Sequence, residues 1–433
     1  MVKVISDFFS RHNFVRHIDI EAIVCALLLD MQNGLCGKTA DQDMIHTFLN
    51  PPESAPVGKS VIVIDAGGTN FRSCLVTFDE DGVPSIELLQ KTKMPGVGQM
   101  LSRTEFFDAI AKNIEHLKDK ADAIGFCFSY GMKISDDGDG TLIMFSKEIN
   151  APEVIGCKIG ACLKEALARH GWTKNPRITL LNDTVAALLA GATAPAIGKR
   201  YSSYIGLILG TGLNAAYIQP KIDTADQSHP LKEQIVVCES GKFSHISLSD
   251  FDTAADSKML NQKTYLMEKQ SSGAYLGAVA YEMLIAAVHE NLLSEQCGQR
   301  IAELKSLSLI EFDDFLHAPF SPDSVIGKIV GESASEQDRD ILFELFDSVV
   351  ERSARYAAAI LAACVIQSGA GTSAAKPVCI VCNGSTYYKT HGIMRRVQGY
   401  LEDVLTVKRG LYWETICIEN DITFGAAIGG LSR

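Results

Sequence analysis

Residues 61–78, VIVIDAGGTNFRSCLVTF, set narrow limits on the fold, because they read as two apolar strands joined by a glycine turn. Short continuous apolar runs are typical of buried strands. The pair Gly67-Gly68 gives the bend backbone dihedrals closed to other residues and lets backbone N–H groups approach a ligand closely. An ordinary hairpin turn would also explain this stretch taken alone. The polar residues at one rim of the predicted hairpin are Asp65, Thr69, Asn70 and Arg72.

The same plan recurs at residues 203–220, SYIGLILGTGLNAAYIQP, where the turn is Gly210-Thr211-Gly212. GTGLNA also fits a dinucleotide-binding pattern, but that fold needs a helix after the glycines, whereas NAAYIQP reads as a strand. Two similar hairpins predict the internal duplication of an α/β unit. Facing each other across a cleft, the two turns would hold a nucleoside triphosphate from both sides.

Between the hairpins lies ITLLNDTVAALLAGA, which reads as a buried strand over 178–181 and a helix over 184–192. Asn182-Asp183 therefore follows the end of a strand, where open α/β sheets place ligand-binding residues. Asp183 is equally a residue type that caps helices. Both interpretations of Asp183 stay open on this stretch alone.

Composition narrows the class of protein further. The chain has 433 residues, 47% of them hydrophobic and 21% charged, which predicts two to three globular domains. A net charge of −12 argues against non-specific binding to nucleic acid or to an anionic membrane. The start of the chain, MVKVISDFFSRHNF, has no long apolar stretch, and the twelve cysteines lie scattered in apolar runs. We therefore expect a cytoplasmic protein without disulfides, in which Cys379 and Cys382 pack in the core rather than bind metal.

These segments together resemble the hexokinase family, within the actin-like ATPase superfold shared with sugar kinases and heat-shock chaperones. DAGGTNFR is similar to the first phosphate motif of the family, GLILGTGLNAAYI to the second, and LNDTVAALLAGA to its catalytic-base segment. FCFSY, MFSKEI, VVCESGKF and LNQKTYLMEKQSSGAYLG match its sugar-binding segments, and CNGSTYYKTH its adenosine-side segment. The matches follow the family order from about residue 20 to the C-terminal ITFGAAIGG.

The resemblance implies an α/β fold of two actin-like, ribonuclease H-like domains built on duplicated βββαβα units with a cleft between them. It implies an N-terminal helical segment (1–56) packed on a large domain (182–419), and a small domain formed by 57–181 and 420–433. The implied activity is ATP-dependent phosphorylation of a hexose, glucose first, at the 6-hydroxyl, as in the first step of glycolysis. A kinase for fructose, mannose or an amino sugar, or a sugar sensor without turnover, stays open, as does the oligomeric state.

The resemblance also assigns residues. Asp183 is the implied catalytic base, and Asp65 is implied to hold the Mg²⁺ that accompanies ATP, through water. The implied contacts to sugar hydroxyls are Ser129, Ser146, Lys147, Asn182, Asp183, Asn214, Glu239 and Glu268. The implied nucleotide-binding residues are Asp65, Gly67, Gly68, Thr69, Asn70, Arg72, Gly210, Thr211, Gly212, Gly384 and Ser385.

This chain departs from the family pattern at a few positions, which bear on sugar and nucleotide selectivity and not on the class of reaction. Where the family has Ser-Phe-Pro, this chain has Ser129-Tyr130-Gly131. Asn383 stands where the family has an acidic residue before the adenosine-side glycine. Ser146-Lys147 replaces the usual Thr-Lys, and Glu239-Ser240-Gly241 replaces the usual Glu-Trp-Gly.

Overall fold

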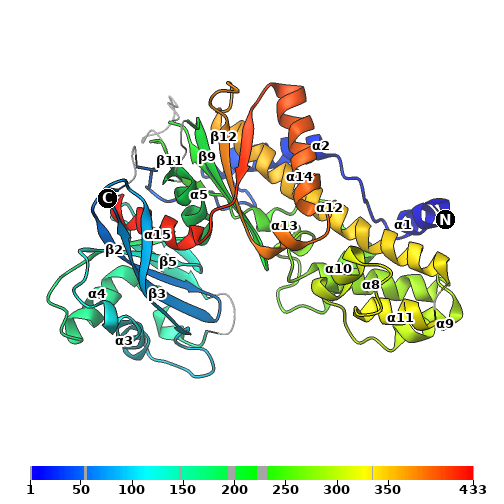
Figure 1. The fold of residues 1–433 in the computed structure, drawn as a ribbon, viewed down its shortest axis with the longest axis horizontal. Coiled ribbons are helices and arrows are strands. Elements are labelled where there is room, and N and C mark those ends of the chain that lie inside the picture. The colour runs from blue at the N-terminus through cyan, green and yellow to red at the C-terminus, as the bar shows by residue number, and fades with distance from the viewer. Residues whose placement is uncertain are drawn as a thin grey trace.

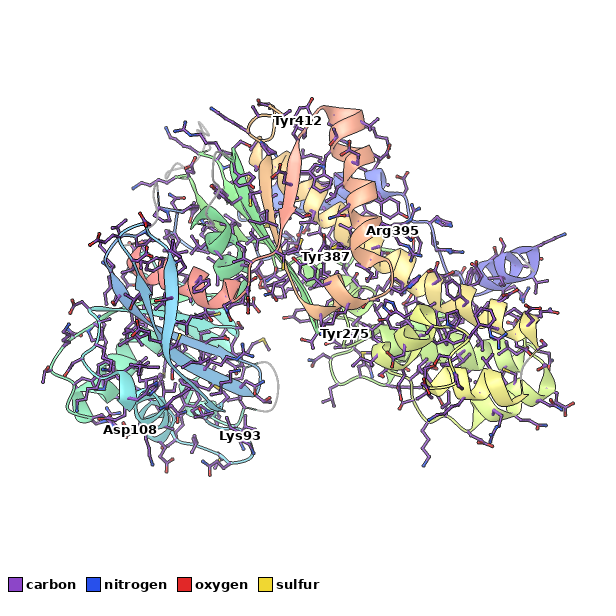
Figure 2. The ribbon with its side chains drawn as sticks, in the orientation of Figure 1. Lys93, Asp108, Tyr275, Tyr387, Arg395 and Tyr412 are labelled. Atoms are coloured by element: carbon purple, nitrogen blue, oxygen red, sulfur yellow. The ribbon has the colours of Figure 1, made fainter. Side chains whose placement is uncertain are left out.

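The computed structural model of the chain describes residues 2–52, 56–145, 149–193, 200–221, 232–333 and 335–432. Figure 1 shows two lobes, each built around its own β-sheet, with helices α5 (Asp183–Thr193) and α15 (Asp421–Leu431) lying between the sheets. In Figure 2, Lys93 and Asp108 mark the lobe of the first sheet, whereas Tyr275, Tyr387, Arg395 and Tyr412 mark the lobe of the second. Among the described residues, no helix is long and apolar enough to cross a membrane.

The first sheet has the order β4-β3-β2-β5-β8. Its first three strands in sequence form an antiparallel meander, and the last two extend β2 in parallel. A separate two-stranded ribbon of β6 and β7 follows β5. The strands are β2 (Ser60–Gly67), β3 (Asn70–Phe78), β4 (Pro84–Lys93), β5 (Ala123–Phe128), β6 (Gly131–Ile134), β7 (Gly140–Met144) and β8 (Arg177–Leu181).

The second sheet repeats this plan as β11-β10-β9-β12-β13 and adds β1 at its edge. Again three strands run antiparallel and two extend the first of them in parallel. The expected duplicated α/β fold is therefore confirmed, including the strand over NAAYIQ. The strands are β1 (Ile45–His46), β9 (Ser203–Leu209), β10 (Leu213–Gln219), β11 (Gln234–Val237), β12 (Val378–Asn383) and β13 (Trp413–Ile416).

Helices cover both sheets. In the first lobe α3 (Arg103–Asn113) and α4 (Ile159–Arg169) pack on the sheet over an apolar core. In the second, the 33-residue α12 (Glu336–Ser368) packs against β9 and β10. Its N-terminus is closed by a capping box of Ser335 and Asp338, and Gly369 ends it in the left-handed conformation. The other helices of this lobe are α6 (Asp250–Ser257), α7 (Leu266–Lys269), α8 (Leu276–His289), α9 (Glu295–Ala302), α10 (Leu309–His317), α11 (Val325–Ser333), α13 (Ser385–Lys389) and α14 (Ile393–Leu401).

The N-terminal segment belongs to the second lobe. α1 (Val2–Arg11) and α2 (Ile20–Leu35) pack on α12, and β1 pairs with β11. None of the twelve cysteines, all of them in described residues, forms a disulfide. Cys379 and Cys382 lie in two different apolar clusters on opposite sides of β12, as their spacing predicts. The residue boundaries of the two domains stay a prediction.

The two halves meet where α5 and α15 cross. A Cβ atom on Gly425 of α15 would lie 1.7 Å from the carbonyl oxygen of Ala186 in α5. A Cβ atom on Gly125 of β5 would lie 1.9 Å from the carbonyl oxygen of Ala426. Both distances are far below van der Waals contact, so the approach of these helices requires glycine. Their shared apolar cluster includes side chains from both sheets.

We expect Gly425→Ala to lower the free energy of unfolding by about 3 kcal/mol, because the added methyl group must push the two helices apart. Gly399→Ala is the matched control, since a Cβ atom on Gly399 of α14 would meet no atom of the described residues within 4 Å. That variant should gain about 0.5–1 kcal/mol from helix propensity. Urea unfolding measures both, and equal stability of the two variants would contradict a glycine-dependent crossing.

Candidate active site

The predicted site residues gather at one edge of the two sheets. The parallel strands β2, β5 and β8 end there, as do β9 and β12, and such ends share an edge. Glu268 comes instead from the short helix α7. Ser146 and Lys147 lie outside the described residues. The positions at or near strand ends are Asp65, Gly67, Gly68, Thr69, Asn70, Arg72, Ser129, Asn182, Asp183, Gly210, Thr211, Gly212, Asn214, Glu239, Gly384 and Ser385.

The first glycine hairpin forms as predicted. Gly67 pairs with Asn70 across a turn in which Gly68 has a φ of +65°. Asp65 pairs with Arg72 across the two strands, and the Arg72 Nη1 atom lies 3.8 Å from Asp65 Oδ2. A Cβ atom on Gly67 would lie 3.8 Å from both Ser129 Oγ and Asp65 Oδ1. The turn, an acidic residue and a predicted sugar contact are thus neighbours.

The second glycine hairpin joins β9 to β10. Its turn is closed by the Gly210 N–H, which donates to the Gly212 carbonyl at 3.0 Å. Gly384, at a φ of +120°, lies against this turn, because a Cβ atom there would be 2.2 Å from the Leu209 carbonyl oxygen. Only glycine fits this position. The predicted adenosine-side segment therefore starts directly beside the second turn.

Glu239 and Asn214 form a half-buried polar pair. Asn214 Nδ2 donates to Glu239 Oε1 at 2.8 Å, and the Glu239 N–H donates to Asn214 Oδ1 at 3.0 Å. Glu239 has a φ of +58°, which costs a non-glycine residue on the order of 1–3 kcal/mol. Strain of this kind concentrates at functional sites, where surrounding contacts hold the side chain in place.

Glu268 links the sugar-binding segment to the second turn. Its Oε2 atom accepts the Leu213 N–H at 2.8 Å, directly after the turn. A Cβ atom on Gly212 would lie 2.9 Å from the same carboxylate oxygen. Any side chain at position 212 would therefore displace Glu268, so a substitution there would disturb a predicted sugar contact as well as the turn.

Asn182 and Asp183 begin α5 directly after β8. The Thr184 N–H donates to Asn182 Oδ1 at 2.8 Å and to Asp183 Oδ1 at 2.7 Å. The amide oxygen of Asn182 thus already supplies a cap for the first turn of the helix. The Asp183 carboxylate is half-buried. Because Asn182 already caps the helix, the position of Asp183 is compatible with a chemical role as well.

Negative charge accumulates around Asp183. Burial raises the pKa of Asp65 to about 6; Arg72 opposes this shift, and the carboxylates of Asp183 and Asp421 add to it. Burial likewise raises the pKa of Glu239 to about 7, with Lys242 opposing and Asp183 among the carboxylates that add to the shift. Asp183 therefore interacts with Asp65 of the first lobe and with Glu239 of the second. Within the described part of the chain, the site holds more carboxylates than nearby cations, which suits a ligand that brings positive charge.

Asp421 is a site residue that the sequence patterns did not single out. It lies at the start of α15 and is 5% exposed, and Asn383 Nδ2 donates to both of its carboxylate oxygens at 2.8 Å. Burial raises its pKa. The residue stands just before the matched segment ITFGAAIGG, but only the crossing of α15 with α5 brings it near Asp65 and Asp183. Asn383, which replaces the acidic residue of the family pattern, thus binds the carboxylate of Asp421 in the same chain.

A duplicated fold with paired glycine turns and strand-end carboxylates defines the class as the actin-like phosphotransferases. The chain belongs to the hexokinase family: models described as hexokinase match residues 7–193 and 204–432.

The chain is also similar to curated hexokinases in sequence and to solved hexokinase structures in fold. Hexokinase-1 of Schizosaccharomyces pombe is 26% identical over 425 residues, which cover 92% of this chain and 84% of the relative. Hexokinase-3 of Oryza sativa subsp. japonica is 29% identical over 78% of this chain and 70% of the relative. The fold is similar to that of a hexokinase from Schistosoma mansoni complexed with glucose, with a TM-score of 0.76, 22% identity and 99% of each chain covered. A second hexokinase crystal structure gives 0.79, at 21% identity and 98% of each chain.

The raised pKa of Glu239 predicts how stability depends on pH. With a native pKa of about 7 against about 4.3 unfolded, the native state binds more protons than the unfolded state between these values. The contribution of Glu239 to stability is therefore full at low pH and is lost as pH rises through 7. We expect Glu239→Gln to gain on the order of 3 kcal/mol over wild type between pH 4.5 and 8.

Urea unfolding at a series of pH values measures this difference. Glu80→Gln, on an exposed turn, is the control and should run parallel to wild type. A Glu239→Gln curve that also runs parallel would contradict a half-buried carboxyl that binds a proton near pH 7.

Proposed function

We propose that this protein transfers the terminal phosphoryl group of ATP to the 6-hydroxyl of a hexose, with glucose as the first candidate, giving hexose 6-phosphate and ADP. The observation that carries the proposal is the position of Asp183. Its carboxylate is close enough to Asp65, beside one glycine turn, and to Glu239, in the half-buried polar pair, to shift the pKa of each. A base at that point can accept the proton of a hydroxyl bound on one side while that oxygen attacks a phosphate bound on the other.

The sugar would be bound by buried amides and carboxylates, which suit a ring of hydroxyl groups because each accepts or donates in a fixed direction. The Asn214–Glu239 pair and Glu268 supply such groups from the second lobe, and Ser129 supplies a hydroxyl from the first. Family resemblance adds Asn182 from the described part of the chain, and Ser146 and Lys147 from outside it.

The triphosphate would be bound between the two glycine turns. Gly67, Gly68 and Thr69 offer backbone N–H groups from one side, with Asn70 and Arg72 beside them. Thr211 and Gly212 offer them from the other, in the turn that the Gly210 N–H closes, next to Gly384 and Ser385. The N-termini of α5 and α15 also point to this region, since Asp183 and Asp421 begin these helices. Helix N-termini favour anions, which offsets part of the negative charge of the carboxylates.

Magnesium fits this donor set. Asp65 offers a half-buried carboxylate beside the first turn, and the neighbouring Asp183 and Asp421 add negative charge that favours a cation. No three acidic, histidine or cysteine side chains of the described residues form a metal-binding group. Mg²⁺ is commonly held by one or two carboxylates together with substrate phosphates and water, and Asp65 would hold it in that way. When bound, the ion would neutralise charge on the phosphate oxygens.

Phosphoryl transfer needs little covalent chemistry from the protein, so positioning and charge stabilisation account for most of the catalysis. Asp183 would accept the proton of the sugar 6-hydroxyl as its oxygen attacks phosphorus. Arg72 would stabilise charge on the phosphate oxygens. The backbone N–H groups of the turns would hold the phosphate chain in line with the attacking oxygen.

A panel of hexoses assayed with ATP and Mg²⁺ tests the proposal directly. Turnover of glucose, fructose, mannose or an amino sugar to its 6-phosphate would support it and name the preferred substrate. Hexose binding without turnover would instead favour a sugar sensor. ATP hydrolysis that does not depend on any sugar would contradict the proposal and favour another class of actin-like ATPase.

Asp183→Asn separates the base from a helix cap. We expect the variant to melt within a few degrees of wild type, because asparagine caps helices about as well as aspartate and Asn182 already contributes. It should bind hexose within a small factor of wild type and lose about 10²–10⁴-fold in kcat, because an amide cannot accept the proton. Near-wild-type kcat in a folded variant would show that Asp183 only caps α5.

A further inference from the structure

The two glycine turns share a feature behind their ligand-facing side: hydroxyl groups from distant segments donate to their backbone carbonyls. A trans peptide unit is planar, so its C=O and the following N–H point in opposite directions. A donor that fixes the carbonyl of residue 68 therefore also fixes the direction of the N–H of residue 69. The orientation of each turn's N–H groups can be followed from the partners of its carbonyls.

In the first turn the partner is Tyr130. Its phenolic oxygen donates to the Gly68 carbonyl at 2.8 Å, and its side chain is 5% exposed. Burial, together with the charge of Asp65, raises the pKa of Tyr130, so the hydroxyl stays protonated and able to donate. The family pattern has phenylalanine at this position, which lacks the hydroxyl. The Thr69 N–H shares the peptide unit of the Gly68 carbonyl and points away from Tyr130.

In the second turn the partners come from α13 and from the segment after α7. The Gly210 carbonyl accepts the Thr386 hydroxyl at 2.8 Å and the Gly273 N–H at 2.7 Å. The Thr211 carbonyl accepts the Ser272 hydroxyl at 2.9 Å. The side chains of Thr386 and Ser272 are 2% and 0% exposed. These bonds direct the N–H groups of Thr211 and Gly212 away from the buried donors.

The directed N–H groups have no acceptor within the described part of the chain: those of Thr69, Thr211 and Gly212 donate to no described residue. Thr69 and Thr211 are exposed. Resting on the function proposed above, we propose that Tyr130 and Thr386, with Ser272, are positioning residues. Their hydroxyls hold the carbonyls of the two turns from behind, so that the N–H groups point at the phosphates of ATP.

This arrangement predicts different effects on nucleotide binding and on hexose binding when one of the hydroxyls is removed. Each hydroxyl acts on ATP through one peptide unit and is directed at a backbone carbonyl rather than at the sugar. Removing it should weaken nucleotide binding and leave hexose binding nearly unchanged. A general packing role would instead lower stability and weaken both ligands together.

Four single variants of the full-length chain test the inference. Tyr130→Phe and Thr386→Val each remove a hydroxyl and keep nearly the same shape, whereas Thr386→Ser keeps the hydroxyl. Tyr356→Phe is the matched control for the tyrosine, because the buried Tyr356 hydroxyl in α12 has no hydrogen-bond partner among the described residues. Calorimetry would measure Kd for the non-hydrolysed analogue AMP-PNP with Mg²⁺ and, separately, for the hexose preferred in the panel assay. Thermal melting would verify that each variant is folded.

We expect Tyr130→Phe and Thr386→Val each to raise the Kd for AMP-PNP by about fivefold, the effect of losing one buried hydrogen bond. The hexose Kd should stay within about twofold, and Thr386→Ser and Tyr356→Phe should bind the analogue like wild type. Unchanged nucleotide affinity in folded Tyr130→Phe and Thr386→Val would overturn the inference. Equal weakening of both ligands would overturn it too.

This result is separable from the fate of the proposed function. A wild-type protein that binds AMP-PNP but phosphorylates no hexose would contradict the proposed function, while the nucleotide affinities of the variants still decide the role of the hydroxyls. A wild-type protein that turns over a hexose, with variants that bind nucleotide normally, would overturn only the role of the hydroxyls.

Discussion

The close crossing of α5 and α15 fixes the position of the two halves of the molecule relative to each other. Gly425 against Ala186, and Gly125 against Ala426, let backbone meet backbone where any side chain would clash. The helix α5 packs on the second sheet and α15 packs on the first. Because the two helices also pack against each other, they join the two halves. The N-termini of both helices therefore reach the same edge, with Asp183 and Asp421 at their first positions.

That geometry concentrates buried carboxylates at one place, and the consequences are electrostatic. Asp65 and Glu239 have raised pKa values chiefly because they are removed from water, and Asp183 adds to both shifts. The fold therefore holds several carboxylates close together and away from water, which disfavours their charged forms. A cation with a polyanion, directed by N–H groups of two rigid turns, would relieve it, which is why the paired turns and the carboxylates make physical sense together.

Contacts between segments also join the parts of the site. Glu268, predicted for the sugar, accepts the N–H of Leu213 beside the second turn. Ser272, four residues later, donates to the carbonyl of Thr211. The predicted sugar-binding segment thus contacts the second turn directly. Tyr130 does the same for the first turn from the residue after Ser129. The predicted sugar and phosphate contacts therefore lie on neighbouring parts of the same backbone.

The local elements of this fold can be predicted from short stretches of the sequence. Continuous apolar runs and paired glycines predict both hairpins, because strand burial and positive φ are properties of a few adjacent residues. Strand, Asn182-Asp183 and helix follow from the same local rules, and motif order identifies the family. Which distant groups come into contact depends instead on the packing of the whole chain. The Asn383–Asp421 pair, the Glu268 contact to Leu213 and the hydroxyls of Tyr130 and Thr386 behind the turns depend on how two lobes pack. No local pattern encodes them, since a hydrogen bond between segments far apart in the chain leaves no spacing rule in either one.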